Sequence, residues 1–236
     1  IINKNFLPGI LKTCTLGYDG KGQYKINSIE DLKDLSIDFK KKYILEKLVN
    51  LKNEISVIVT RFNYERYEIY DPIENIHEDQ ILKKSKIPAH ISEENFKKSK
   101  LWATQIAEEL NYIGTLCVEF FIDKNDNLFV NEVAPRVHNS GHLTINSYNI
   151  SQFENHIRAI TESPLGQTTI TSKFSAMINI IGVHGPIQKV LKTKNAHLHL
   201  YNKEERTGRK LGHITLTSNS IDELNKMIES LKEYLP

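Results

Sequence analysis

The segment VNEVAPRVHNSGH, residues 130–142, gathers a carboxylate, an arginine, two histidines and two side-chain amides into thirteen positions. It begins within a run of strand-forming residues, so its polar groups come at the end of a predicted strand. Carboxylate oxygens suit a divalent cation, whereas Arg136, His138 and Asn139 offer positive charge and hydrogen bonds to an anionic substrate. The segment therefore predicts a site for chemistry on a small, charged molecule.

The predicted strand belongs to a hairpin. Residues 115–122 and 128–134 both have the composition of strands, and the four residues between Asp123 and Leu128 are turn formers. An antiparallel pairing that sets Asp123 opposite Leu128 closes this hairpin.

Two carboxylates oppose each other in that hairpin. Counting inward from the turn places Glu119 opposite Glu132, on one face of the sheet. Like charges directly opposed on a sheet are destabilising unless something compensates them, and a divalent cation with oxygen ligands does so. Asn131 could add a neutral oxygen. The alternative is a solvent-facing pair tolerated at a sheet edge.

The two histidines of the segment suggest a zinc site as a rival hypothesis. His138 and His142 are four residues apart, so a helix would be needed to bring both onto one face. Pro135 and the Ser-Gly pair between the histidines make a helix unfavourable, which argues against zinc.

A glycine-rich stretch, LGYDGKGQ, separates two predicted strands at 9–15 and 23–27. It lacks the Gly-Lys-Ser/Thr of a Walker loop, yet such a flap can lay backbone N–H groups over a triphosphate. Lys12, in the preceding strand, could reach a phosphate as a point charge. A plain hairpin turn and a surface lysine are the alternatives.

Composition limits the class of protein. The chain of 236 residues carries 31 Lys and Arg against 29 Asp and Glu, which is too balanced for a nucleic-acid surface. Cys14 and Cys117 are predicted to be reduced packing residues. No apolar run approaches the ~20 residues that span a bilayer, so a cytoplasmic protein without membrane contact is expected. Because the sequence begins without methionine, a missing N-terminal portion is expected too.

The order of predicted elements is α+β with antiparallel hairpins, and it lacks the alternation of a doubly wound sheet. Residues 68–85 are predicted as a strand that gives way to an irregular polar loop. Helices are expected from Ser28 to near Phe39 and at 92–111, with Ser28 and Ser92 as their N-caps, and at 151–162 and 220–235. Further strands are expected at 43–50, 54–62, 169–182, 197–202 and 209–218.

Several motifs taken together resemble one enzyme family. They are, in chain order, ILKT, GYDGKGQ, EKLV followed by Glu54, NIHED, VEFF, NEVAPRVHNSGH, SQFENHIRAIT and GRKLGH. In this order they resemble the 5-(carboxyamino)imidazole ribonucleotide synthases, ATP-grasp enzymes of purine biosynthesis. The NEVAPRVHNSGH segment followed by SQFENHIRA is the specific part, whereas the glycine loop and paired acids mark ATP-grasp enzymes more widely.

The resemblance implies an ATP-grasp fold of two α+β lobes, at 1–47 and 48–166, followed by a small β-rich subdomain at 167–236. Relatives carry an N-terminal Rossmann-like domain that has no counterpart here, so the sequence is expected to be a fragment. A homodimer is implied for the full-length protein.

The resemblance also implies roles for residues. Glu119 and Glu132, with Asn131 beside them, resemble magnesium ligands. Arg136, His138 and Asn139 resemble part of the bicarbonate and ribonucleotide pocket. The residues that resemble the ATP contacts are Lys12, the loop Gly17, Tyr18, Asp19, Gly20, Lys21, Gly22 and Gln23, the adenine linker Glu46, Lys47, Leu48 and Val49, the ribose ligand Glu54, and His77. The residues that resemble a cluster at the ribonucleotide phosphate are Lys203, Arg206, Arg209 and Lys210.

The implied reaction is the ATP-dependent carboxylation of 5-aminoimidazole ribonucleotide by bicarbonate through carboxyphosphate, with ATP and Mg²⁺ as cofactors. Two alternatives stay open: another ATP-grasp ligase, of the formate-dependent glycinamide ribonucleotide transformylase or biotin carboxylase type, and a truncated nucleotide-binding module that is inactive by itself. The Gly-Arg-Lys run near Lys203 is too short a basic cluster for nucleic acid.

Overall fold

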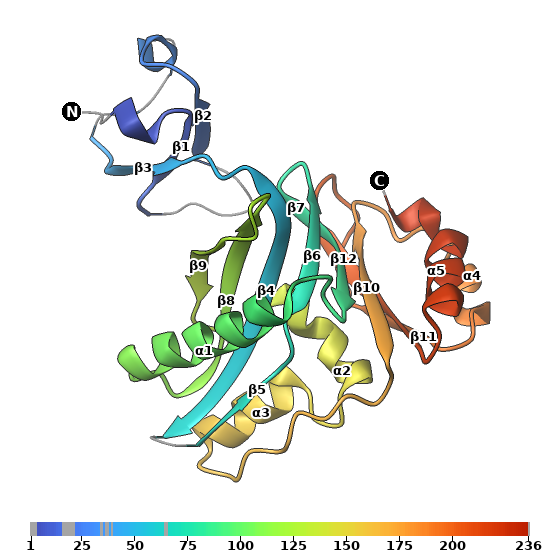
Figure 1. Cartoon of the computed structure of the whole chain (residues 1–236). Helices are drawn as coiled ribbons and strands as arrows, with labels where there is room; N and C mark the ends of the chain where they lie inside the picture. The colour runs from blue at the N-terminus through green and yellow to red at the C-terminus, as the bar shows by residue number, and fades with distance from the viewer. Residues whose placement is uncertain are drawn as a thin grey trace. The chain divides into compact units, whose positions relative to one another are not determined.

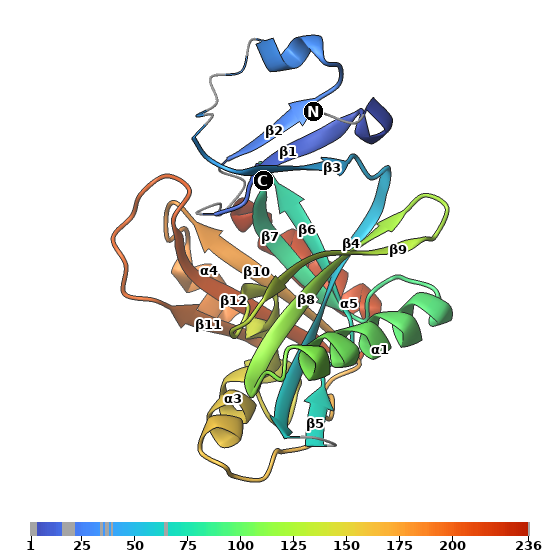
Figure 2. The same cartoon turned by 90° about the vertical axis from the view of Figure 1, so that its left-hand side faces the viewer.

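The computed structural model of the chain divides into two compact units, residues 1–50 with 79–81 and residues 51–78 with 82–236 (Figures 1 and 2). It describes residues 4–15, 22–33, 35, 38, 40–63 and 66–235. The glycine-loop residues Gly17, Tyr18, Asp19, Gly20 and Lys21 lie outside the described residues.

The first unit contains a three-stranded antiparallel sheet in the order β2-β1-β3. Its elements are η1 (Lys4–Phe6), β1 (Gly9–Thr13), β2 (Gln23–Ile26), η2 (Glu30–Lys33) and β3 (Tyr43–Lys47). The hairpin predicted on both sides of the glycine stretch is therefore confirmed. Gly22 has a φ of +80°, and a Cβ there would lie 2.7 Å from the Thr13 hydroxyl oxygen, so only glycine fits this end of the loop.

The helix expected from Ser28 begins differently from the prediction. Among the described residues 28–33, 35 and 38, Glu30–Lys33 form the 3₁₀ turn η2 and not an α-helical turn. Ser28 was predicted to cap this helix by accepting a hydrogen bond from a backbone amide. Its hydroxyl instead donates to the Asp31 carboxylate, which also accepts from the Asn27 backbone amide. These local bonds satisfy a tight turn and compete with an α-helix.

The second unit is built on a nine-stranded sheet in the order β11-β12-β10-β7-β6-β4-β8-β9, with β5 paired to β4. Its strands are β4 (Leu51–Asn63), β5 (Arg66–Ile69), β6 (Ile73–Glu78), β7 (Ile81–Ile87), β8 (Gly114–Asp123), β9 (Leu128–Ala134), β10 (Phe174–Ile181), β11 (Ala196–Leu200) and β12 (Lys210–Ser218). The polar loop predicted within residues 68–85 is wrong: β6 and β7 are strands whose polar residues share the sheet with buried Ile73 and Leu82.

Helix α1 (Glu93–Glu109) covers one face of β4 and β8, beside which it runs in Figures 1 and 2. Ser92 caps it by accepting from the Asn95 amide, as its sequence predicted. Ala103 and Ala107 pack there against alternate strand residues such as Val57 and Val118. Side chains alternate between the two faces of a strand, so the odd-numbered residues of β4 and the even-numbered residues of β8 face α1. The other residues of these two strands face the opposite side of the sheet.

The other helices are α2 (Thr144–Ser147), α3 (Gln152–Ile160), α4 (Ile187–Lys192) and α5 (Ile221–Ser230), with the 3₁₀ helices η3 (Asn139–Leu143) and η4 (Lys232–Tyr234). A separate core packs α4 and α5 onto β10 and β12 through Ile178, Val190, Ile214 and Leu224. No helix in the described part of the chain combines the length and hydropathy that a bilayer crossing requires.

Candidate active site

The sheet face opposite α1 collects the polar residues of four neighbouring strands, which we call the site face. The registers place Ser56 of β4 beside Glu119 of β8, and Glu54 beside Asn75 of β6. His77 follows Asn75 by two residues, so its backbone position presents the same face. The even-numbered residues of β4 and the odd-numbered residues of β6 and β8 therefore lie on the face opposite α1, where they are available for chemistry.

Glu119 lies opposite Glu132 in the β8–β9 register, which confirms the predicted pair. The predicted turn register is wrong by one residue, because Ile122 and not Asp123 pairs with Leu128. A β-bulge restores the count: Phe120 pairs with Val130 and Glu119 with Glu132, leaving Asn131 as the extra residue. The bulge thus sets the backbone positions of Glu119 and Glu132 opposite each other, with Asn131 next to Glu132 in the chain.

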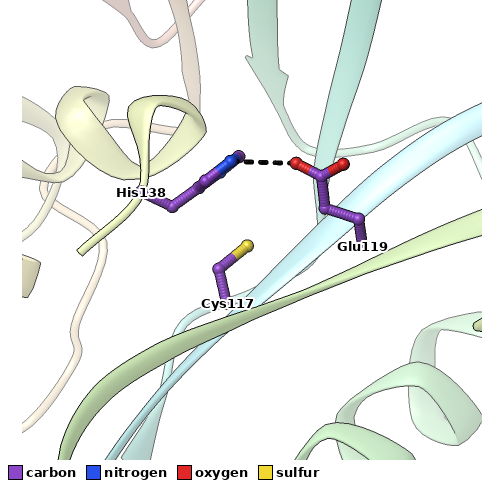
Figure 3. A group of neighbouring side chains, drawn as sticks. All are labelled: Cys117, Glu119 and His138. Carbon is purple, nitrogen blue, oxygen red and sulfur yellow. Dashed lines mark ion pairs between the residues drawn. The ribbon is translucent and has the colours of Figure 1, made fainter. Parts of the chain in front are cut away.

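Glu119 also contacts the loop that follows β9. Its carboxylate oxygen lies 2.9 Å from Nε2 of His138, and the two side chains are only 15% and 12% exposed (Figure 3). Burial disfavours the charged imidazole, but Cys117 and Glu119 outweigh it and raise the pKa of His138 to about 10. Burial likewise opposes the carboxylate of Glu119, yet its pKa is lowered by His138, His77 and Arg136. His138 is therefore a cation at neutral pH, held by an anion.

A buried chain of hydrogen bonds supports this ion pair. Ser85 donates to the amide oxygen of Asn75, Asn75 donates to Ser56, and Ser56 donates to Ser140 at 2.7 Å. The Ser140 hydroxyl lies 2.8 Å from Nδ1 of His138. Strands β7, β6 and β4 and the loop are thereby connected to one imidazole ring, which fixes its orientation.

The loop itself is held by Gln152 at the start of α3. Its side chain accepts from the His138 amide at 2.9 Å and donates to the His138 carbonyl at 2.7 Å. Gly141 lies against the same side chain, since a Cβ there would fall 2.6 Å from the Gln152 amide oxygen and 2.1 Å from Ile58. The absence of a side chain at Gly141 thus allows the loop to pack closely on β4 and α3.

The prediction that this loop avoids a helix is wrong in part. Residues 139–143 form the 3₁₀ helix η3, with His138 as its N-cap. The two histidines of the loop belong to different groups of side chains. Among residues 4–15, 22–33, 35, 38, 40–63 and 66–235, only Cys117, Glu119 and His138 form a group of metal-binding type, and His142 is not part of it.

His142 lies in a different cluster, formed with β11 and β12. Its ring is 5.3 Å from that of His213, and His213 stacks on His199 at 4.4 Å with an interplanar angle of 11°. The Tyr201 hydroxyl lies 2.7 Å from Nδ1 of His213. Burial lowers the pKa of His142 to about 4 and that of His213 to about 2, and neighbouring cations and histidines add to the effect. These rings are neutral at pH 7.

Two pairs of predicted nucleotide ligands contact each other. In the first unit, Lys12 Nζ lies 2.7 Å from a carboxylate oxygen of Glu46 across the β1–β3 pair. In the second, Nδ1 of His77 lies 2.6 Å from a carboxylate oxygen of Glu54. Of the adenine linker, Lys47 ends β3, and the Leu48 amide donates to the Pro8 carbonyl. Val49 and Gln23 have no described side-chain bond to a predicted site residue.

The remaining predicted residues follow β9 or precede β12. Arg136 is exposed, with its guanidinium donating to the Val137 carbonyl. Both polar atoms of the Asn139 side chain are buried and have no hydrogen-bond partner among the described residues, as expected of a group kept for a ligand. Lys203 lies over the Tyr201 ring, at 5.3 Å from its centroid.

The basic cluster occupies the segment before β12. Arg206 and Arg209 belong to one turn, in which the Arg209 amide donates to the Arg206 carbonyl. Lys210 begins β12 and, like Arg136, lowers the pKa of His142 by its charge. Lys210 is therefore the member of the cluster that the structure connects to the loop after β9.

Two features of the site were not predicted from the sequence: the presence of Cys117 in it and the buried hydrogen-bond chain. Cys117 is buried as predicted, but it also lies within the site. Cys14 is exposed, which contradicts its predicted packing role. The position of Cys117 two residues before Glu119 was a usable signal, because residues i and i+2 of a strand share a face. The serines and Asn75 of the buried chain had no such signal, since their partners are distant in sequence.

The fold and the opposed carboxylates define the class of protein. Residues 2–153 match the ATP-grasp domain family, and the chain belongs to that family. Residues 175–227 match the family described as phosphoribosylaminoimidazole carboxylase C-terminal domain.

Similar proteins and solved structures of this family include several with the name of one enzyme. The chain is 45% identical over 214 residues to N5-carboxyaminoimidazole ribonucleotide synthase of Brucella melitensis, covering 88% of this chain and 58% of that protein. The crystal structure of the synthetase from Thermus thermophilus matches with a TM-score of 0.88 and 40% identity over 97% of this chain and 62% of that one. The Aspergillus clavatus enzyme in complex with ADP and 5-aminoimidazole ribonucleotide matches with a TM-score of 0.85 and 31% identity, over 96% and 62%. The chain thus spans about three fifths of the length of these relatives.

Proposed function

We propose that this chain is the nucleotide-binding and C-terminal portion of an N5-carboxyaminoimidazole ribonucleotide synthase. The whole enzyme would use ATP and bicarbonate to carboxylate the exocyclic amine of 5-aminoimidazole ribonucleotide, with release of ADP and phosphate. The observation that carries the proposal is the opposed pair Glu119 and Glu132, followed within one loop by Arg136, His138 and Asn139. This combination occurs in a chain whose relatives carry that name. The lobe boundaries near residues 47 and 166 are part of the same proposal.

The residues at the β8–β9 bulge fit a magnesium ion. Glu119 and Glu132 are opposed carboxylates and Asn131 supplies an amide at the bulge, which is the oxygen donor set that Mg²⁺ takes. Bound there, Mg²⁺ would offset the negative charge of the ATP phosphates. Lys12 would hold a phosphate oxygen as a point charge, and Glu54 with His77 would bind the ribose side of the nucleotide.

The loop residues would act on bicarbonate. His138 is cationic at neutral pH because Cys117 and Glu119 raise its pKa against the effect of burial, so it can hold an anion without a change of protonation. Arg136 would stabilise the negative charge that moves between bicarbonate, carboxyphosphate and the carbamate product. The unsatisfied amide of Asn139 would orient the substrate by hydrogen bonds. Lys203, Arg206, Arg209 and Lys210 would receive the ribonucleotide phosphate.

Nucleotide binding is the part of the proposal that the chain itself can test. Titration with a non-hydrolysable ATP analogue should show binding that depends on Mg²⁺, and Glu132→Gln should weaken it at least tenfold. The same variant should abolish ATP turnover, measured as ADP release with bicarbonate and 5-aminoimidazole ribonucleotide, while the circular dichroism stays that of the native chain. Glu109→Gln, at the exposed end of α1, is the matched control.

The outcomes separate the two halves of the proposal. Magnesium-dependent binding without ribonucleotide-stimulated ADP release would identify a nucleotide-binding module that does not turn over by itself. Turnover unchanged in Glu132→Gln would exclude the metal assignment. Stimulation by glycinamide ribonucleotide with formate, or by biotin, in place of 5-aminoimidazole ribonucleotide would favour another ATP-grasp ligase.

A further inference from the structure

The group of Cys117, Glu119 and His138 joins three different kinds of metal ligand at one point of the site face. Their sulfur, carboxylate oxygen and imidazole nitrogen atoms all lie within 4.8 Å of one another. Figure 3 shows the thiol and the carboxylate rising from the same strand toward the ring of His138. Two of the ligands come from β8 and one from the loop after β9, so the group depends on the tertiary fold.

The chemistry of this donor set differs from that of the magnesium site. Magnesium takes oxygen ligands almost exclusively, whereas a thiolate and an imidazole select zinc and similar divalent cations. Around a tetrahedral zinc ion with bonds of about 2.0–2.3 Å, ligand atoms are separated by roughly 3.5 Å. The widest separation in the group would shorten by roughly 1 Å to reach that spacing. The 2.9 Å between Nε2 of His138 and the Glu119 oxygen would lengthen by roughly 0.6 Å.

His138 is already oriented for such a role. Its Nδ1 lies 2.8 Å from the Ser140 hydroxyl, so Nε2 is the nitrogen that faces Glu119. Metal-binding histidines are commonly fixed in this manner through the second ring nitrogen. The chain from Ser140 to Ser56 and Asn75 holds that hydroxyl in place.

We propose that Cys117, Glu119 and His138 form a binding site for a thiophilic divalent cation of the zinc class. On binding, the Cys117 sulfur and His138 Nε2 would each release a proton to solvent, and a water molecule would complete a tetrahedral set. Glu119 would belong both to this site and to the magnesium pair with Glu132. In so far as the proposed function holds, zinc would therefore inhibit the enzyme by withdrawing a magnesium ligand.

Cobalt tests the site directly, because Co²⁺ replaces zinc and a cobalt–thiolate bond absorbs in the near ultraviolet. The reduced 236-residue chain, freed of metal with a chelator, is titrated with Co²⁺ alone and then with Zn²⁺. We expect a charge-transfer band that saturates at one equivalent of Co²⁺ and disappears on addition of Zn²⁺. Nucleotide is absent, so failure of the proposed function would not affect this result.

The two cysteines of the chain supply a matched pair of variants. Cys117→Ser should remove the charge-transfer band and weaken Zn²⁺ binding by about a hundredfold or more, since loss of even an outer-shell partner costs up to that much. Cys14→Ser should keep both, because Cys14 is exposed and lies in the other unit. Cys117→Ala, compared by circular dichroism, shows whether loss of the band is due to the ligand or to unfolding.

Two results would overturn the proposal. One is the absence of a cobalt–thiolate band in the native chain. The other is a band that persists in folded Cys117→Ser or Cys117→Ala and is lost in Cys14→Ser, which would place the metal at the exposed thiol of the first unit.

Discussion

His138 and His142 are separated by four residues of one loop, yet their protons are held in opposite ways. The pKa of His138 is raised to about 10, and that of His142 is lowered to about 4. Both side chains are largely buried, so burial by itself disfavours the charge on each. The charges that surround each ring therefore decide the outcome.

The surroundings differ because the loop lies between two parts of the sheet. His138 faces β8, where the Glu119 carboxylate and the Cys117 thiol favour a positive ring. His142 faces β11 and β12, where burial lowers its pKa most and the charges of His138, Lys210 and His199 lower it further. The 3₁₀ helix η3 thus has a cationic histidine at its N-cap and a neutral histidine within it.

Removing the carboxylate beside His138 should give the largest effect. Glu119→Gln keeps a hydrogen-bond acceptor but loses the charge, so the pKa of His138 should fall by about 1–3 units. Nuclear magnetic resonance of the imidazole during a pH titration measures it. Glu94→Gln, in the first turn of α1 on the opposite face, should leave it unchanged. An unaltered pKa in Glu119→Gln would mean that the ion pair does not determine the charge of His138.

The two histidines should affect the free energy of unfolding at opposite ends of the pH range. The pKa of His142 is about 4 in the folded chain, against an ordinary value of 6.5. As the pH drops below 6.5 the unfolded chain therefore binds the proton first, and the free energy of unfolding falls. Over the interval from pH 6.5 to 5 this amounts to about 2 kcal/mol, at 1.36 kcal/mol per unit. His138 has a folded pKa near 10, so its contribution is complete below pH 6.5 and is lost as the pH rises through about 10.

Urea unfolding at pH 7 and pH 5 tests the acidic end. The loss of stability between these two pH values should be smaller in His142→Asn than in the native chain. The exposed His90→Asn should retain the native difference. Equal differences in His142→Asn and the native chain would contradict the assignment of this acid sensitivity to His142.

The hydrogen-bond chain behind His138 should contribute measurably to the free energy of unfolding. Ser140→Ala removes the acceptor of the Ser56 hydroxyl and a partner of His138 in a fully buried position, at a cost of about 1–3 kcal/mol in unfolding free energy. Ser147→Ala is the matched control, because that hydroxyl is equally buried and has no hydrogen-bond partner among the described residues. Its cost should be near zero. Equal effects of the two substitutions would show that the chain adds nothing beyond packing.

Local signals identified much of the site. The alternation within β8 and β9 was enough to pair Glu119 with Glu132, although the turn register was wrong by one and the bulge at Asn131 made up the difference. The serine cap predicted α1 because capping is a short-range interaction. The β6–β7 region was missed because polar residues there bond across the sheet, as Asn75 does to Ser85.

By itself, the sequence determined the α+β class, the ATP-grasp motifs and the order of the residues that could do chemistry, because hydrophobic period and turn formers act over a few residues. Only the tertiary structure decided which of these residues meet. It joined Cys117 and Glu119 to His138, and it placed His142 among the histidines of β11 and β12. The physical reason is that a proton responds to all charges within several ångströms, whatever their separation along the chain.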